Sequence, residues 1–128
     1  MWLSILLILL VAVWLFLPRL GWMRFDKAVE ALRSGGVLVD VRTPAEYATD
    51  RIKGAENIPL SELEEGVRRA GCKADRPVLL YCASGMRSGT ARRRLKALGF
   101  AEAGNLGSFA RARKIVDAAG HPASSPES

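Results

Sequence analysis

The sequence contains few residues of the kinds that bind metals. Its 128 residues include two cysteines, Cys72 and Cys82, and one histidine, His121. The cysteines are spaced neither as C-x-x-C nor as a zinc-ligand pair, and a single histidine cannot complete a zinc site. We therefore expect no metal and no other cofactor. The two thiols could form one disulfide, but reduced thiols are the better expectation.

Basic residues exceed acidic residues, but they are not arranged as a nucleic-acid-binding surface. The formal net charge is +6. The lysines and arginines are scattered along the chain without interleaved aromatic residues, which argues against a nucleic-acid partner. A modest positive charge suits an anionic substrate or an anionic membrane surface. The chain shows no internal repeat, and its length allows one domain and little more.

Polar residues are almost missing from the first 17 positions. Residues 1–17 read MWLSILLILLVAVWLFL, and Ser4 is the one clearly polar side chain. A cleaved signal peptide has a basic residue before its apolar run and small residues at its cleavage site, and neither is present here. We expect residues 1–22 to form a retained transmembrane anchor, although seventeen helical residues are at the short end for a bilayer. A signal peptide and a buried core helix are the alternatives.

Positive charge follows this apolar segment and does not precede it. Arg19, Arg24 and Lys27 come soon after the segment, whereas only the terminal amine lies before it. The positive-inside rule then places the rest of the chain in the cytoplasm. We expect a single-pass protein of the inner membrane, with its domain in a compartment that keeps thiols reduced.

Residues 23–120 alternate between strand and helix patterns. Short apolar runs predict buried strands over 37–41 and 77–82, with a weaker strand over 101–106. Strands that alternate with helices predict the α/β class, with a parallel sheet that helices cover on both faces. Residues 121–128 are expected to form a disordered tail.

Capping residues mark where the helices of this domain begin. A side-chain cap is predicted at four positions, Asp26, Thr43, Ser61 and Ser108. A further helix is predicted over 88–98, where Gly99 ends it.

Cys82 stands where the second strand ends and a loop begins. Ala83, Ser84, Gly85 and Met86 separate it from Arg87. These small or flexible residues allow successive backbone N–H groups to point at one spot, and the next helix adds its positive end. Such surroundings lower the pKa of a thiol, because they stabilise the thiolate. The alternative is a buried strand cysteine that acts as a small apolar residue.

From about Asp26 to Ala119 the chain resembles the rhodanese domain. The segments that carry the resemblance are Val39-Asp40-Val41-Arg42 with Glu46-Tyr47, Gly54-Ala55-Glu56-Asn57-Ile58-Pro59, and Val78-Leu79-Leu80-Tyr81-Cys82 with Gly85, Arg87 and Ser88. The resemblance implies a sheet of about five parallel strands flanked by helices. It also implies that sulfane sulfur moves from a donor, typically thiosulfate, through a persulfide on Cys82 to a thiol or cyanide acceptor.

The same resemblance assigns expected roles around Cys82. The loop from Ala83 to Ser88 binds the substrate, Asp40 forms hydrogen bonds toward that loop, and Arg42 contributes charge. A plain surface ion pair between Asp40 and Arg42 is the alternative.

The length of the Cys82 loop and two departures from the usual rhodanese sequence pattern bear on the expected activity. Related phosphatases place five residues between the cysteine and the arginine, whereas this chain has the four from Ala83 to Met86, a tighter loop that suits sulfur better than phosphate. Asp50-Arg51 stands where family members often have Gly-His, and Phe109 follows Gly107-Ser108 without the usual tryptophan. A persulfide carrier or docking module at the membrane, without turnover, is the alternative function.

Overall fold

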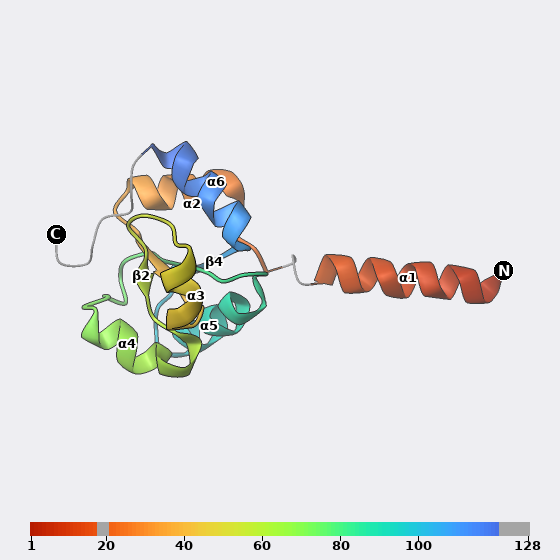
Figure 1. Cartoon of the computed structure of the whole chain (residues 1–128), viewed down its shortest axis with the longest axis horizontal. Coiled ribbons are helices and arrows are strands. Elements are labelled where there is room, and N and C mark those ends of the chain that lie inside the picture. Colours follow the sequence, from red (N-terminus) through yellow and green to blue (C-terminus); the bar gives the residue numbers. More distant parts are fainter. Residues whose placement is uncertain (18–20, 121–128) are drawn as a thin grey trace.

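The computed structural model describes residues 1–17 and 21–120, and it shows an α/β domain preceded by one apolar helix (Figure 1). Helix α1 (Trp2–Phe16) contains no buried residue. At 1.5 Å per residue it is about 22 Å long, against roughly 30 Å for the hydrocarbon core of a bilayer. Among the described residues, no helix combines the length and the apolar character needed to cross a membrane. The structure therefore does not support the transmembrane helix predicted over 1–22.

The sheet contains four parallel strands in the described part of the chain. In spatial order they are β2 (Glu56–Asn57), β1 (Val37–Asp40), β3 (Val78–Tyr81) and β4 (Ala103–Gly107). Every residue of β1, β3 and β4 is buried, as expected for strands covered on both faces. The predicted parallel α/β fold is confirmed.

The expected fifth strand is reduced to a single bridge beside β4. Trp22 pairs in parallel with Asn105, and the Met23 N–H donates to the Asn105 carbonyl at 2.8 Å. The chain then turns into helix α2 (Phe25–Arg33), for which Arg24 is already the N-cap. The start of helix α2 limits this edge strand on its C-terminal side.

Helices cover both faces of the sheet. Helices α2 and α6 (Phe109–Ala119) lie together on one face, and α4 (Leu63–Arg69) and α5 (Met86–Ala97) lie on the other (Figure 1). Leu38, Leu79 and Leu106 pack into the hydrophobic core between the sheet and helices α2 and α6. Val39 and Leu80 pack into the core between the sheet and helices α4 and α5. The alternation follows from the two-residue period of a strand.

The caps of the helices were predicted with mixed success. Thr43 is the predicted N-cap of helix α3 (Pro44–Thr49), where it also forms a capping box with Glu46, and Ser108 caps α6 by accepting from the Arg111 N–H. The predictions at Asp26 and Ser61 were wrong. Asp26 lies inside the first turn of α2, and Ser61 lies in a 3-10 turn, η2 (Leu60–Glu62), ahead of α4.

Candidate active site

Cys82 lies directly after β3, at the carboxyl edge of the sheet, and is fully buried. The Gly85 N–H donates to its Sγ at 3.0 Å, and the Ser88 Oγ lies 3.5 Å from the same sulfur. The chain after β4 fixes the loop from the other side: the Cys82 N–H donates to the Gly107 carbonyl at 3.3 Å, and the Phe109 N–H donates to the Ala83 carbonyl at 3.4 Å. The loop therefore wraps the sulfur with donors aimed inward.

These donors control the ionisation of Cys82. Burial by itself raises the pKa of a thiol. Here the Ser88 hydroxyl and the backbone N–H groups of Ser88, Gly85 and Ser84 outweigh burial and hold the Cys82 pKa below its ordinary value. A lower pKa favours the thiolate, which is the nucleophilic form of a cysteine.

Gly85 shapes the loop in two ways. Its φ of +94° lies in the left-handed region that favours glycine. A Cβ at this position would also come within 2.7 Å of the Trp22 Nε1, because the indole packs over the loop. Helix α5 begins at the next residue, two positions earlier than predicted, so Arg87 and Ser88 lie in its first turn. Met86 is 67% exposed.

Arg87 is bound to a carboxylate that sequence reasoning had not assigned to the site. Its guanidinium donates to both oxygens of Glu46, at 2.7 and 3.0 Å. Hydrogen bonds from Arg87 and from the Thr43 N–H lower the pKa of Glu46 to about 2. Glu46 is also the main cause of the raised pKa of Arg87, and the side chain of Cys82 adds a smaller effect. The positive charge near Cys82 is therefore partly balanced.

Asn105 is the second site residue that the sequence did not reveal. It is 2% exposed, and its Oδ1 accepts from the Ser88 Oγ at 2.7 Å and from the Gly107 N–H at 2.9 Å. Its Nδ2 donates to the Gly85 carbonyl at 3.0 Å. The one available signal was a polar amide inside a predicted apolar strand, since such a group must find partners in the core.

Asp40 and Arg42 form a buried ion pair at the end of β1. The Arg42 Nη2 lies 2.8 Å from the Asp40 Oδ2, and the Arg42 guanidinium also stacks over Phe109 at 4.6 Å from the ring centroid. The side-chain hydrogen bonds of Asp40 run to Arg42, not toward the Cys82 loop as predicted. Burial opposes the charge of Arg42, but Asp40 outweighs it and raises the Arg42 pKa. The pair fixes the turn between β1 and α3.

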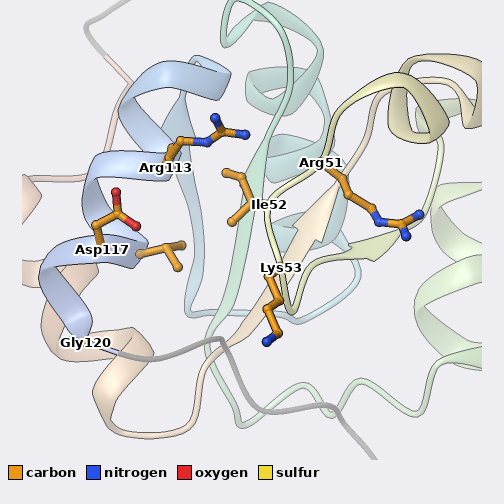
Figure 2. Close-up of a pocket in the computed structure, with 7 residues that line it drawn as sticks. Arg51, Ile52, Lys53, Arg113, Asp117 and Gly120 are labelled. Atoms are coloured by element: carbon orange, nitrogen blue, oxygen red, sulfur yellow. The ribbon is translucent and has the colours of Figure 1, made fainter.

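A separate hollow lies between α6 and the segment 51–53 (Figure 2). Its volume is about 460 Å³, and Arg113 and Asp117 of α6 line one side together with Gly120, the C-cap of that helix. Arg113 is paired with Asp50 at 3.1 Å, and Arg51 lies over the Tyr47 ring at 5.1 Å. No lining residue belongs to the Cys82 loop.

The fold and this site define a class of protein: a parallel α/β domain with a cysteine in a loop between a strand and a helix, and with hydrogen-bond donors of that loop aimed at the sulfur. The family follows from comparison with known proteins. The model of the rhodanese-like domain matches residues 25–111, and this chain belongs to that family.

Relatives and solved structures agree with this assignment. Over 69 residues, 54% of this chain, it is 45% identical to the uncharacterized protein YqhL of Bacillus subtilis and 36% identical to the thiosulfate sulfurtransferase PspE of Escherichia coli. The matches cover 53% and 66% of those two proteins, so the chain spans between half and two thirds of their lengths.

Two solved structures extend the comparison. An E. coli rhodanese with anions aligns at a TM-score of 0.57 and 33% identity, covering 59% of this chain and 89% of that one. The human single-domain sulfurtransferase TSTD1 aligns at a TM-score of 0.62 and 25% identity, covering 73% and 96%.

Proposed function

We propose that this protein moves sulfane sulfur from thiosulfate or a similar donor to a thiol or cyanide acceptor through a persulfide on Cys82. The observation that carries the proposal is the hydrogen-bonded sulfur of Cys82, which accepts from the Gly85 N–H at 3.0 Å inside a loop that precedes a helix N-terminus. Similarity to an E. coli thiosulfate sulfurtransferase supports the same chemistry.

The reaction has two balanced steps. The Cys82 thiolate attacks the sulfane sulfur of thiosulfate, the S–S bond of the donor breaks, and its electron pair leaves on sulfite. The acceptor thiolate or cyanide then attacks the outer sulfur of the persulfide, and Cys82 leaves as a thiolate. The loop N–H groups stabilise the sulfur anion before and after each transfer.

The intact mass of the protein tests this function. Incubation of the full chain with thiosulfate should add the mass of about one sulfur atom. Cys82→Ser should abolish the gain, and Cys72→Ser is the matched control that should retain it. An unchanged mass in the natural chain, or a gain that survives in Cys82→Ser, would contradict the proposal.

A persulfide carrier without turnover is the second candidate, and the state of Arg87 favours it. Because Glu46 already binds both ends of that guanidinium, less free positive charge remains to hold a small dianion. A carrier would take sulfur from a protein donor while its steady-state turnover of thiosulfate with cyanide stays negligible. The two rates, measured on one preparation, distinguish the candidates.

We further propose that α1 attaches the domain to the inner membrane, with the domain on the cytoplasmic side. The helix is apolar on every side, with Ser4 as its one clearly polar side chain, and none of its residues is buried by the domain. Arg24 and Lys27 follow it closely, which supports the cytoplasmic side. Flotation of the full chain with lipid vesicles tests attachment, and a reporter fused to the C-terminus tests the side.

A further inference from the structure

The active-site loop lies close to the apolar helix, whatever direction that helix takes. Four peptide links join Leu17 to Gly21, which limits their Cα separation to about 15 Å. The next residue, Trp22, packs its indole against both Gly85 and Gly107. If lipid holds α1, the mouth of the Cys82 loop must therefore lie near the membrane surface.

A cavity of about 570 Å³ lies at this junction. On one side are Trp14 and Leu17, at the end of α1, together with Trp22. On the other side are Ser84 and Met86, both exposed residues of the Cys82 loop. Its lining is mainly apolar, with hydroxyl groups on the loop side. A ligand with an apolar part and a polar end fits this arrangement.

Positive charge borders the same place. A second hollow, also of about 570 Å³, shares Leu17 and Met86 with the first and is lined by Arg87 and Arg93. Arg87 is paired with Glu46, whereas Arg93 donates only to the Thr90 hydroxyl among the described residues. A guanidinium without an acidic partner suits a phosphate group beside an apolar surface.

We propose that the sulfur acceptor of this protein is an amphiphilic thiol held at the membrane surface, of the kind that a phosphate-bearing lipid with a thiol headgroup represents. Its apolar part lies against Trp14, Trp22 and Met86, and its phosphate lies near Arg93. Its thiolate attacks the outer sulfur of the Cys82 persulfide, the S–S bond breaks, and Cys82 leaves as a thiolate. This inference rests on the proposed function and names its acceptor.

Vesicles of phosphatidylcholine that contain a few per cent phosphatidylthioethanol provide the probe. The full chain is loaded with thiosulfate, freed of excess donor and mixed with the vesicles, and the loss of sulfur from the protein is followed by intact mass. 2-Mercaptoethanol serves as the soluble acceptor. The matched variant carries twelve Gly and Ser residues inserted between Gly21 and Trp22, which lengthens the connection about fourfold and keeps Trp22 in place.

The short connection between α1 and Trp22 should raise the rate of sulfur transfer only when the acceptor thiol is bound to the membrane. Effective concentration falls roughly as the −3/2 power of linker length, so the insertion should slow transfer to the lipid about eightfold. Transfer to 2-mercaptoethanol should be unchanged. Met86→Ser in the natural chain should slow transfer to the lipid severalfold, because it removes apolar surface from the cavity.

Each contrary outcome identifies what has failed. Equal lipid rates for the natural and lengthened chains would overturn the inference. So would a chain that loads sulfur but does not float with vesicles and sediments as a dimer, because α1 would then bind a second copy. If no sulfur loads onto Cys82 before vesicles are added, the proposed function itself fails.

Discussion

The two cysteines, Cys82 and Cys72, are in opposite electrostatic surroundings. Hydrogen bonds lower the pKa of Cys82 in spite of burial, whereas burial and the charge of Glu56 raise the pKa of Cys72. The rate of alkylation of each thiol by iodoacetamide should therefore rise with pH at different points, with the inflection for Cys82 below that for Cys72. Peptide mass spectrometry of single-cysteine variants measures both profiles. Coincident inflections, or the reverse order, would refute this prediction.

The hydroxyl of Ser88 is a side-chain donor close to the sulfur of Cys82. Its Oγ lies 3.5 Å from Sγ and 2.7 Å from the Asn105 Oδ1. Removing a hydrogen bond of this kind costs about 0.5–1.5 kcal/mol, so Ser88→Ala should raise the Cys82 pKa by roughly half to one unit. Persulfide formation at pH 7 should slow accordingly and recover at higher pH.

Thr90→Ala is the matched control for Ser88→Ala, because Thr90 carries an exposed hydroxyl on the same helix. It should leave the alkylation profile of Cys82 unchanged. If Ser88→Ala also leaves the profile unchanged, the Ser88 hydroxyl does not lower the pKa of the thiol.

The sequence predicted the site residues whose partners lie close by in the chain. It missed the site residues whose partners lie far away in the sequence. Cys82 and Gly85 belong to one loop, whose chemistry is readable from residue type and spacing. Glu46 reaches Arg87 over 41 positions, and Asn105 reaches Gly85 over 20. Their roles depend on which strands are neighbours in the sheet, and a local pattern contains no such information.

At the scale of elements, the junction between β3 and α5 depends on Gly85. An alanine at position 85 would be strained by the left-handed backbone conformation, and its Cβ would clash with the Trp22 indole. Gly99 has a similar φ, +98°, but a Cβ would find nothing within 4 Å. Gly99→Ala should therefore cost only the backbone strain, about 1–2 kcal/mol, and Gly85→Ala should cost about 1–3 kcal/mol more.

Urea unfolding of the two glycine variants measures this difference. Trp22→Ala should reduce the cost of Gly85→Ala toward that of Gly99→Ala, since the obstructing ring is gone. Equal costs at both glycines in the natural background would show that Trp22 does not restrict the loop.

The ion pair between Glu46 and Arg87 joins α3 to the first turn of α5. The pKa of Glu46 in the folded protein, about 2, is below its ordinary value of 4.5. The ion pair therefore makes its full contribution to the free energy of unfolding above about pH 4.5. Its contribution disappears as the pH falls toward 2. Both side chains are about one third exposed, so the contribution is about 1 kcal/mol or less.

The unfolding free energies of the natural protein and of Glu46→Gln should therefore differ at pH 7 and converge as the pH falls from 4.5 toward 2. Asp26→Asn is a suitable control, because Asp26 belongs to an exposed ion pair with Arg24 that includes no residue of the loop. A difference that does not change with pH would show that the charge of Glu46 does not contribute to the stability of the fold.

The order of the elements was easier to predict than their number and their ends. Runs of apolar residues predicted strands β1, β3 and β4, because buried strands consist largely of apolar residues. The edge strand could not be predicted, since Trp22 and Met23 look like the end of the apolar segment and acquire their place only by packing against β4. Ser61 failed as a cap for a related reason: the chain tightens into η2 before α4 begins.

At the scale of the whole molecule, packing against the sheet begins at Trp22 within the part of the chain that the structure describes. Helix α1 contains no buried residue, whereas Trp22 lies over Gly85 and Gly107 and the Met23 N–H bonds to Asn105. A chain without residues 1–17 should thus keep its unfolding free energy within about 0.5 kcal/mol. A chain without residues 1–23 should lose about 2–4 kcal/mol, because two partly buried side chains and an edge hydrogen bond are removed. Urea unfolding of the three chains in one detergent-containing buffer measures both differences. Equal stability of the two shortened chains would mean that the packing of Trp22 does not stabilise the domain. The shape of the loop around Cys82 would then depend on Gly85 and Asn105 and not on Trp22.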